Sequence, residues 1–200
     1  MAKLIFRYAT MGSGKSAEIL QIHYNYEQRG IKGLLLIPEI DTTSDGFIRS
    51  RLGLLSPAIK FKTSDNLIKL FEEYLEPDVK YIIIDECNFL REEQVDQLKE
   101  IVNKYDIAVM CYGLLTNFRT KLFEGSKRLI EIADIKEPLS IKTLCSCGKS
   151  AIYNARFING ELVTEGEEVV IDKKDGKINP NSIEYRPICD KCYRKLKNKK

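Results

Sequence analysis

The feature that most restricts how this chain can fold is the stretch ATMGSGKS at residues 9–16. Gly14, Lys15 and Ser16 fit the pattern G-x-x-x-x-G-K-S/T. In that pattern backbone N–H groups surround nucleotide phosphates, the lysine reaches the β and γ oxygens, and the hydroxyl contacts Mg²⁺. Ala9 stands where the pattern starts with glycine. A small residue fits this position if its backbone φ stays negative. A chance glycine-rich turn is the alternative.

The neighbouring residues match those of a phosphate-binding loop. Residues 3–9 (KLIFRYA) are an apolar run typical of a buried strand, and residues 16–30 are typical of a helix that ends at Gly30. His23 is the only histidine, and we interpret it as a packing residue. The inward positions of this helix recur at helical spacing: Ile19, Ile22, His23 and Tyr26.

Strand-like and helix-like stretches alternate through the first two thirds of the chain. This alternation is typical of βαβ units and predicts an α/β fold with a parallel sheet. After the first helix, strands are predicted at residues 32–38, 79–85 and 107–114, and helices at residues 64–76, 91–105 and 126–134.

Two of these helices have a clear apolar face. The helix at 64–76 should begin at a cap on Ser64 or Asp65 and bury Leu67, Ile68, Phe71 and Leu75. The helix at 91–105 should bury Val95, Leu98, Ile101, Val102 and Tyr105. Residues 39–57 show no regular period and collect turn residues, so a loop near the site is predicted there.

Two acidic residues, Asp85 and Glu86, end the predicted strand YIII. Ligands of open α/β sheets bind at the carboxyl ends of the strands, and an acid after four apolar residues is typical of the Walker B motif. Asp85 would hold Mg²⁺, and Glu86 would take a proton from the group that attacks the γ-phosphorus. Two solvated acids at a strand end are the alternative.

The acid pair does not indicate which nucleophile is activated, because activation of water gives an ATPase and activation of a bound alcohol gives a kinase. A small-molecule kinase needs an acceptor pocket that excludes water, with apolar walls and a lid. Phe89, Phe118 and Phe123 follow strand carboxyl ends and could line such a pocket. Ordinary core packing is the alternative for each of them.

Four of the six cysteines form two close pairs about forty residues apart. In a reducing compartment such pairs are more typical of metal ligands than of disulfides, and four free thiols are a further alternative. Four thiolates suit tetrahedral zinc and leave no open position, which predicts a structural ion. The ion would stabilise a small unit after residue 142, where a β-hairpin is predicted around Asn159-Gly160. The predicted ligands are Cys145, Cys147, Cys189 and Cys192.

The bulk composition excludes some classes of protein. The chain has 200 residues, 44% of them hydrophobic, and a net charge of +3. No apolar run approaches the ~18 residues that a membrane span needs, so we expect a cytoplasmic protein without a membrane partner. The basic residues 191–200 are interpreted as a solvated, frayed terminus, with a nucleic-acid patch as the alternative.

Taken together, the motifs resemble the type II thymidine kinase family over nearly the whole length of the chain. The matching segments are ATMGSGKSAEIL, DECNF, CYGLLTNFRTKLF and EYRPICDKCY. The resemblance implies a RecA-like P-loop NTPase fold with helices on both faces of the parallel sheet. It also implies an ATP-binding domain at 1–142 and a small zinc-ribbon-like lasso domain at 143–200 that closes over the nucleoside. The implied reaction transfers the γ-phosphate of ATP to the 5′-hydroxyl of thymidine.

The resemblance also implies roles for individual residues. Glu86 matches the family's proton acceptor, Lys15 and Ser16 its phosphate and Mg²⁺ contacts, and Asp85 the carboxylate beside the metal. The implied ATP contacts are Ala9, Thr10, Met11, Gly12, Ser13, Gly14, Lys15, Ser16, Asp85, Glu86, Cys87 and Asn88. The implied nucleoside contacts are Phe89, Leu114, Phe118, Phe123, the main chain of Glu168, Val169, Val170, Ile171 and Asp172, and the side chain of Tyr185.

The chain departs from the family pattern in two places. Asp41-Thr42-Thr43 lacks the arginine of the family's Asp-x-Arg, which leaves Arg49 and Arg51 as alternatives, and the lasso segment 172–185 is longer than in relatives. Family members are commonly tetramers and often accept deoxyuridine. A RecA-type ATPase that is stimulated by nucleic acid and carries a zinc ribbon is the second hypothesis. The modest charge and short chain weigh against it, so no nucleic-acid partner is expected.

Overall fold

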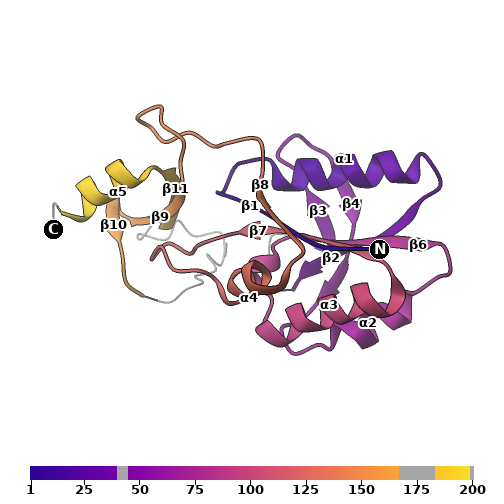
Figure 1. Cartoon of the computed structure of the whole chain (residues 1–200). Helices are drawn as coiled ribbons and strands as arrows, with labels where there is room; N and C mark the ends of the chain where they lie inside the picture. Colours follow the sequence, from indigo (N-terminus) through magenta and orange to yellow (C-terminus); the bar gives the residue numbers. More distant parts are fainter. Residues whose placement is uncertain (40–44, 167–182, 199–200) are drawn as a thin grey trace.

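The computed structural model describes residues 1–39, 45–166 and 183–198 (Figure 1). Its main element is a six-stranded sheet in which every neighbouring pair is parallel. The strand order is β5-β2-β6-β7-β1-β8. In chain order the strands are β1 (Leu4–Ala9), β2 (Lys32–Pro38), β5 (Ile59–Phe61), β6 (Val79–Ile84), β7 (Ala108–Leu114) and β8 (Ile135–Pro138).

Helices cover both faces of this sheet. Figure 1 shows α1 (Lys15–Glu27) on one face and α2 (Leu67–Tyr74) and α3 (Glu92–Tyr105) on the other, where α4 (Glu124–Ile132) also packs. Successive strand residues point to opposite faces. Ile83 accordingly packs with Ile19 of α1, whereas Ile82 packs with Leu98 of α3. The α/β class, the parallel sheet and the two-sided cover are therefore confirmed.

Several local predictions were wrong at the edges of this core. Within 39–57, the predicted loop, β3 (Phe47–Arg49) and β4 (Leu55–Pro57) form an antiparallel pair. The cap of α2 is Asn66, whose side chain accepts the Lys69 N–H at 3.0 Å, instead of Ser64 or Asp65. Leu75 lies beyond the helix and is 37% exposed. The short edge strands β5 and β8 were missed, because their sequences are too brief and mixed to show a period.

A second, antiparallel sheet follows the linker after β8. It has the order β10-β9-β11, with β9 (Tyr153–Ile158), β10 (Glu161–Val163) and β11 (Ile183–Ile188). The predicted hairpin is confirmed, since Asn159 and Gly160 at its turn have φ of 52° and 82°. The expected frayed terminus was wrong as far as Lys197, because α5 (Asp190–Lys197) buries Tyr193 against this sheet.

No helix in the described part of the chain combines the length and the apolar character that crossing a bilayer requires.

Candidate active site

The stretch 10–14 joins the carboxyl end of β1 to the first residue of α1. Gly12 and Gly14 have φ of 76° and 85°, a region that glycine enters without steric cost. Ala9 needs no such freedom. It ends β1 in register with Leu114 of β7, and its φ is not positive. The strand, loop and helix of a phosphate-binding loop are therefore present, and alanine at the first position is compatible with them.

The acid pair lies beside this loop. Asp85 follows β6, is 3% exposed, and accepts the Ser16 hydroxyl on Oδ2 at 2.8 Å. Its other oxygen, Oδ1, accepts the Glu86 N–H at 2.9 Å. Lys15 is also buried, at 7% exposure. A hydroxyl and a carboxylate in direct contact beside a phosphate loop are oxygen donors of the kind that Mg²⁺ takes, so these residues fit the ion.

Glu86 begins a tight turn that continues as the 3₁₀ segment η1 (Cys87–Phe89). Its side chain is half-buried, whereas Cys87 and Asn88 are buried at 0% and 2% exposure. The Asn88 side-chain oxygen accepts the Leu114 N–H at 2.9 Å. Asn88 therefore connects the turn to the end of β7, and whether it or Cys87 contacts a nucleotide stays a prediction.

The structure places the predicted aromatic residues in two groups. Phe89 and Phe123 meet edge to face, with ring centroids 5.8 Å apart. Phe118, 2% exposed, instead lies under the Arg156 guanidinium, 3.6 Å from the ring centroid. Tyr185 joins this second group, because its hydroxyl accepts the Arg156 Nε–H at 2.8 Å.

Arg156 is a residue of the site region that we did not predict. It lies in β9 directly opposite Tyr185 and is 2% exposed. A charged side chain at such depth requires partners, and here it has an aromatic face and a phenol. The available signal was an arginine inside the strand-like run YNARFI, flanked by apolar residues.

The second sheet also holds the phosphate loop directly. The Met11 N–H donates to Asn154 Oδ1 at 2.8 Å, and the Met11 carbonyl accepts the Thr143 hydroxyl at 3.1 Å. Both backbone groups of a loop residue are thus bonded to side chains beyond residue 142. These contacts were not predicted, because nothing in the local pattern of either residue indicates a distant partner.

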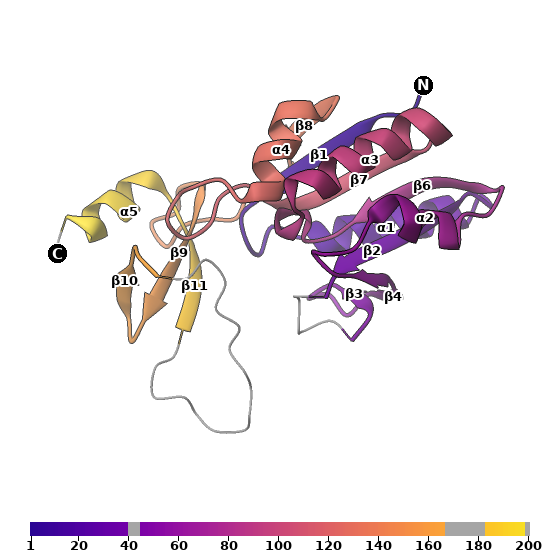
Figure 2. The same ribbon diagram turned by 90° about the horizontal axis from the view of Figure 1, so that it is seen from below.

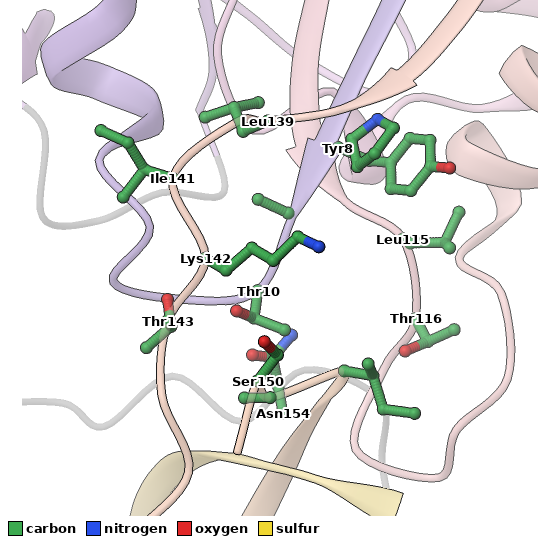
Figure 3. Close-up of a pocket in the computed structure, with 14 residues that line it drawn as sticks. Tyr8, Thr10, Leu115, Thr116, Leu139, Ile141, Lys142, Thr143, Ser150 and Asn154 are labelled. Carbon is green, nitrogen blue, oxygen red and sulfur yellow. The ribbon is translucent and has the colours of Figure 1, made fainter. Parts of the chain in front are cut away.

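A cavity of about 300 Å³ lies beside this contact (Figure 3). Tyr8 and Thr10 line it from β1 and the loop, Asn154 lines it from β9, and Ala151 lines it from the segment just before β9. Figure 3 shows the amine of Lys142 inside it. None of the predicted aromatic residues lines this cavity. The cavity therefore lies between β1, the linker after β8 and β9, and it is not formed by the predicted nucleoside residues.

Arg49 and Arg51 were the two alternatives for the arginine that the family pattern has and this chain lacks, and Arg51 lies at the phosphate loop. Nη1 of Arg51 is 3.6 Å from the position that a Cβ would take on Gly12. Arg49 instead stacks on Phe47, 5.3 Å from the ring centroid. Other predicted residues lie outside the described ranges: Asp41, Thr42, Thr43, Glu168, Val169, Val170, Ile171 and Asp172.

The four predicted ligand cysteines converge, with all four Sγ atoms within 4.8 Å of one another. Cys147 and Cys189 Sγ are 3.6 Å apart. Zn–S bonds of about 2.3 Å in a tetrahedron place sulfurs about 3.8 Å apart, so this cluster fits zinc. Backbone N–H groups of Cys147 and Cys189 lower the pKa of the Cys145 thiol to about 6, whereas bonds with the other three thiols raise the pKa of Cys192 to about 12. The cluster therefore favours the thiolate, the form that binds metal, at Cys145 and not at Cys192.

The fold and these residues define a P-loop nucleotide-binding protein of the α/β class with a four-cysteine cluster. A family model described as thymidine kinase matches residues 2–194. The chain is 45% identical over 190 residues to a thymidine kinase of Legionella pneumophila, covering 93% of this chain and 90% of the relative. It is 38% identical over 196 residues to one of Francisella tularensis, covering 97% and 98%. The chain therefore belongs to the thymidine kinase family.

Proposed function

We propose that this chain transfers the γ-phosphate of ATP to the 5′-hydroxyl of thymidine, giving dTMP and ADP. The observation that best supports this proposal is the hydrogen bond from the Ser16 hydroxyl to Asp85, which Glu86 follows in the chain. This contact brings the end of a phosphate loop and an acid pair to one point. Membership of the thymidine kinase family supports thymidine as the acceptor.

The loop and its neighbours would hold the triphosphate. Lys15 would place its charge on the β and γ oxygens, and Arg51, whose Nη1 lies 3.6 Å from the position of a Cβ on Gly12, would add a second positive charge at the loop. Ser16 and Asp85 would hold Mg²⁺, which neutralises phosphate charge when bound. These side chains favour a transition state in which negative charge spreads over the transferred group.

Glu86 would act as the general base. As the 5′-oxygen forms its bond to the γ-phosphorus, the bond from that phosphorus to the β,γ-bridging oxygen breaks and ADP leaves. The hydroxyl proton passes to the Glu86 carboxylate. The half-buried position of Glu86, directly after Asp85 and three residues before Phe89, supports this role.

The nucleoside would lie against the aromatic residues. Phe89, Phe118, Phe123 and Leu114 are proposed to enclose the thymine ring, and the unit at 143–200 to close over it, with Tyr185 as one contact. The Arg156 side chain, which lies between Phe118 and Tyr185, supports this because it joins the two parts. Main-chain contacts from residues 168–172 are proposed from the family resemblance alone.

Three finer points are also proposed from the resemblance. Deoxyuridine should serve as a second acceptor, since it differs from thymidine by one methyl group. The chain should assemble as a homotetramer and act in the cytoplasm, in pyrimidine deoxynucleoside salvage. Light scattering coupled to size-exclusion chromatography measures the assembly.

A phosphotransfer assay tests the proposal. Labelled ATP and Mg²⁺ are mixed with a panel of nucleosides, with and without single-stranded DNA. We expect label in thymidine and deoxyuridine monophosphates only. ATP hydrolysis that needs no nucleoside and rises with DNA would instead support the RecA-type ATPase.

The role of Glu86 is tested by Glu86→Gln, which keeps the shape and removes the base. General-base assistance contributes about 10²–10⁴-fold, so kcat should fall by that factor with ATP binding retained. Glu93→Gln, at an exposed glutamate in the first turn of α3, is the matched control and should keep the wild-type rate. A wild-type rate in Glu86→Gln would show that another group takes the proton.

A further inference from the structure

Three glycines in the described part of the chain leave no room for a side chain although their φ lies outside the left-handed region: Gly33, Gly113 and Gly125. Two of them face the same turn, Glu86 to Leu90. A Cβ on Gly113 would lie 2.7 Å from Cys87 Sγ and 2.8 Å from Asn88 Oδ1. A Cβ on Gly125 would lie 2.6 Å from the Cys87 carbonyl oxygen and 2.7 Å from that of Leu90.

Backbone conformation does not explain these two glycines. Gly113 lies inside β7 and Gly125 in the first turn of α4, where glycine is less favourable than alanine. The close approach of the turn is the remaining physical reason for a residue without Cβ. Gly113 of β7 and Gly125 of α4 therefore form a packing surface, called here the seat, that contacts the turn from two sides.

Hydrogen bonds join the same three elements. The Leu114 N–H, next to Gly113, donates to Asn88 Oδ1 at 2.9 Å. The Ser126 hydroxyl, next to Gly125, donates to the Leu114 carbonyl at 2.6 Å and is fully buried. The turn, the end of β7 and the start of α4 are thus one bonded and closely packed junction.

The first residue of this turn, Glu86, has φ of 50° and ψ of 38°. A residue with a side chain is strained in this left-handed region and persists there only where its surroundings hold it. Its N–H donates to Asp85 Oδ1 at 2.9 Å, and its carbonyl accepts the Phe89 N–H at 3.1 Å. The conformation of Glu86 thus depends on the placement of the turn behind it.

We propose that Gly113 and Gly125 are positioning residues, which seat the turn so that the Glu86 carboxylate reaches the nucleoside hydroxyl. This inference rests on the proposed function, in which Glu86 is the base. A methyl group at Gly125 must push the turn outward, because the atoms it would meet are backbone oxygens. At Gly113 it would meet the buried Cys87 and Asn88 side chains and, at 3.0 Å, the Asn88 backbone nitrogen, so the same turn would have to shift. Displacing a catalytic group by about 1 Å costs on the order of 10²-fold in rate.

The test compares Gly125→Ala and Gly113→Ala with wild type. We expect kcat for thymidine to fall by about 10- to 10²-fold in each, while the KM for ATP stays within about twofold. A purely structural role would instead lower the folded fraction and leave kcat per folded molecule unchanged. Circular dichroism and ATP titration give the folded and binding-competent fractions.

Gly33→Ala is the matched control, since a Cβ there would lie 2.1 Å from a ring carbon of Tyr81. Gly33 lies near the amino end of β2, away from the carboxyl edge, so its variant should lose thermal stability and keep kcat per folded molecule. A fall in kcat equal to that of Gly125→Ala would overturn the proposal. So would wild-type kcat in both Gly113→Ala and Gly125→Ala.

A second-site variant covers the case in which a single variant does not fold. Cys87→Ala removes the sulfur that a Cβ on Gly113 would meet, so it should recover part of the kcat lost by Gly113→Ala, measured against Cys87→Ala alone. If Cys87→Ala and Gly113→Ala instead change kcat independently of each other, Gly113 does not position the turn through Cys87. If wild type does not phosphorylate thymidine, the proposed function fails first, before the glycine variants are compared.

Discussion

The six-stranded and the three-stranded sheets are stabilised by different means. Each face of the larger sheet carries an extended apolar cluster, with residues such as Phe6 and Ile83 fully buried. The smaller sheet has one small cluster, which includes Cys145 and Cys189 themselves. Figure 2 shows the smaller sheet and α5 to one side of the larger sheet, away from its helical layers. The larger sheet thus has an extensive buried core on each face, whereas the smaller sheet buries little and carries a cysteine cluster that could hold a metal, from which we predict that only the smaller region depends on an ion.

Loss of the predicted metal should produce the largest difference in stability between the two regions. Structural zinc contributes on the order of 10 kcal/mol to small domains, so Cys192→Ser should lower bound zinc from about one per chain to near zero. Amide exchange in β9 to β11 should become fast while β6 and β7 stay protected, because their core is separate. Elemental analysis and hydrogen exchange measure the two effects.

Cys111→Ala is the control for this change, since Cys111 is buried in β7 and does not belong to the four-cysteine cluster. It should keep the zinc. Retention of zinc by Cys192→Ser, with unchanged exchange in β9, would show that the second region is held by burial after all.

A cavity in the larger core should have the next largest effect. Phe71 of α2 is 2% exposed, and Phe71→Ala should lower the free energy of unfolding by about 3–5 kcal/mol. Zinc content should not change, because Phe71 belongs to the cluster between α2, α3 and the sheet. Urea titration followed by circular dichroism measures the loss.

Tyr74→Ala on the same helix is the matched control, since Tyr74 is 46% exposed. It should change stability by less than about 1 kcal/mol. Equal losses in the two variants would mean that helix propensity, and not burial, stabilises this region.

The smallest expected effect is a pH dependence from His23, which lies on the α1 face. Its Nδ1 is 2.8 Å from the Tyr81 hydroxyl and its Nε2 is 3.4 Å from Glu27 Oε1. Burial lowers the pKa of His23 below the ordinary 6.5, against the opposing charge of Glu27. The unfolded chain therefore binds the proton more readily, and the stability from neutral His23 is complete above pH 6.5 and lost as pH falls through the folded pKa.

Urea titrations at pH 7 and pH 5 measure this effect against His23→Gln. One proton contributes at most about 1.4 kcal/mol per pH unit, so wild type should lose up to that slope more than the variant. The same pH dependence in both proteins would remove His23 as the source.

Sequence patterns predicted the parts of the site that are contiguous in the chain. The phosphate loop, the pair Asp85 and Glu86 and the close cysteine pairs each depend on spacing within a few residues, which a linear pattern shows directly. The apolar periods likewise predicted the strands and helices of the core. The prediction that Ser16 and Asp85 share one site followed from the rule that strand carboxyl ends meet at one edge of a parallel sheet.

Contacts between distant segments could not be predicted in this way. Arg156 and Tyr185 meet only because β9 and β11 pair in one register, and Asn154 reaches Met11 only because the linker returns the chain to the loop. Asn66, and not Ser64 or Asp65, caps α2, whose first residue Leu67 is buried in the core. The edge strands β5 and β8 depend on a sheet that was already formed by other strands.

Local period and spacing in the chain are enough to predict an α/β fold with a phosphate loop, an acid pair and a cysteine cluster. How these parts act together depends on tertiary contacts. The tertiary structure placed Gly113 and Gly125 against the turn of Glu86, and Arg51 beside Gly12. Such contacts depend on distances between segments that are far apart in the chain, and close packing sets those distances only after the whole core has formed.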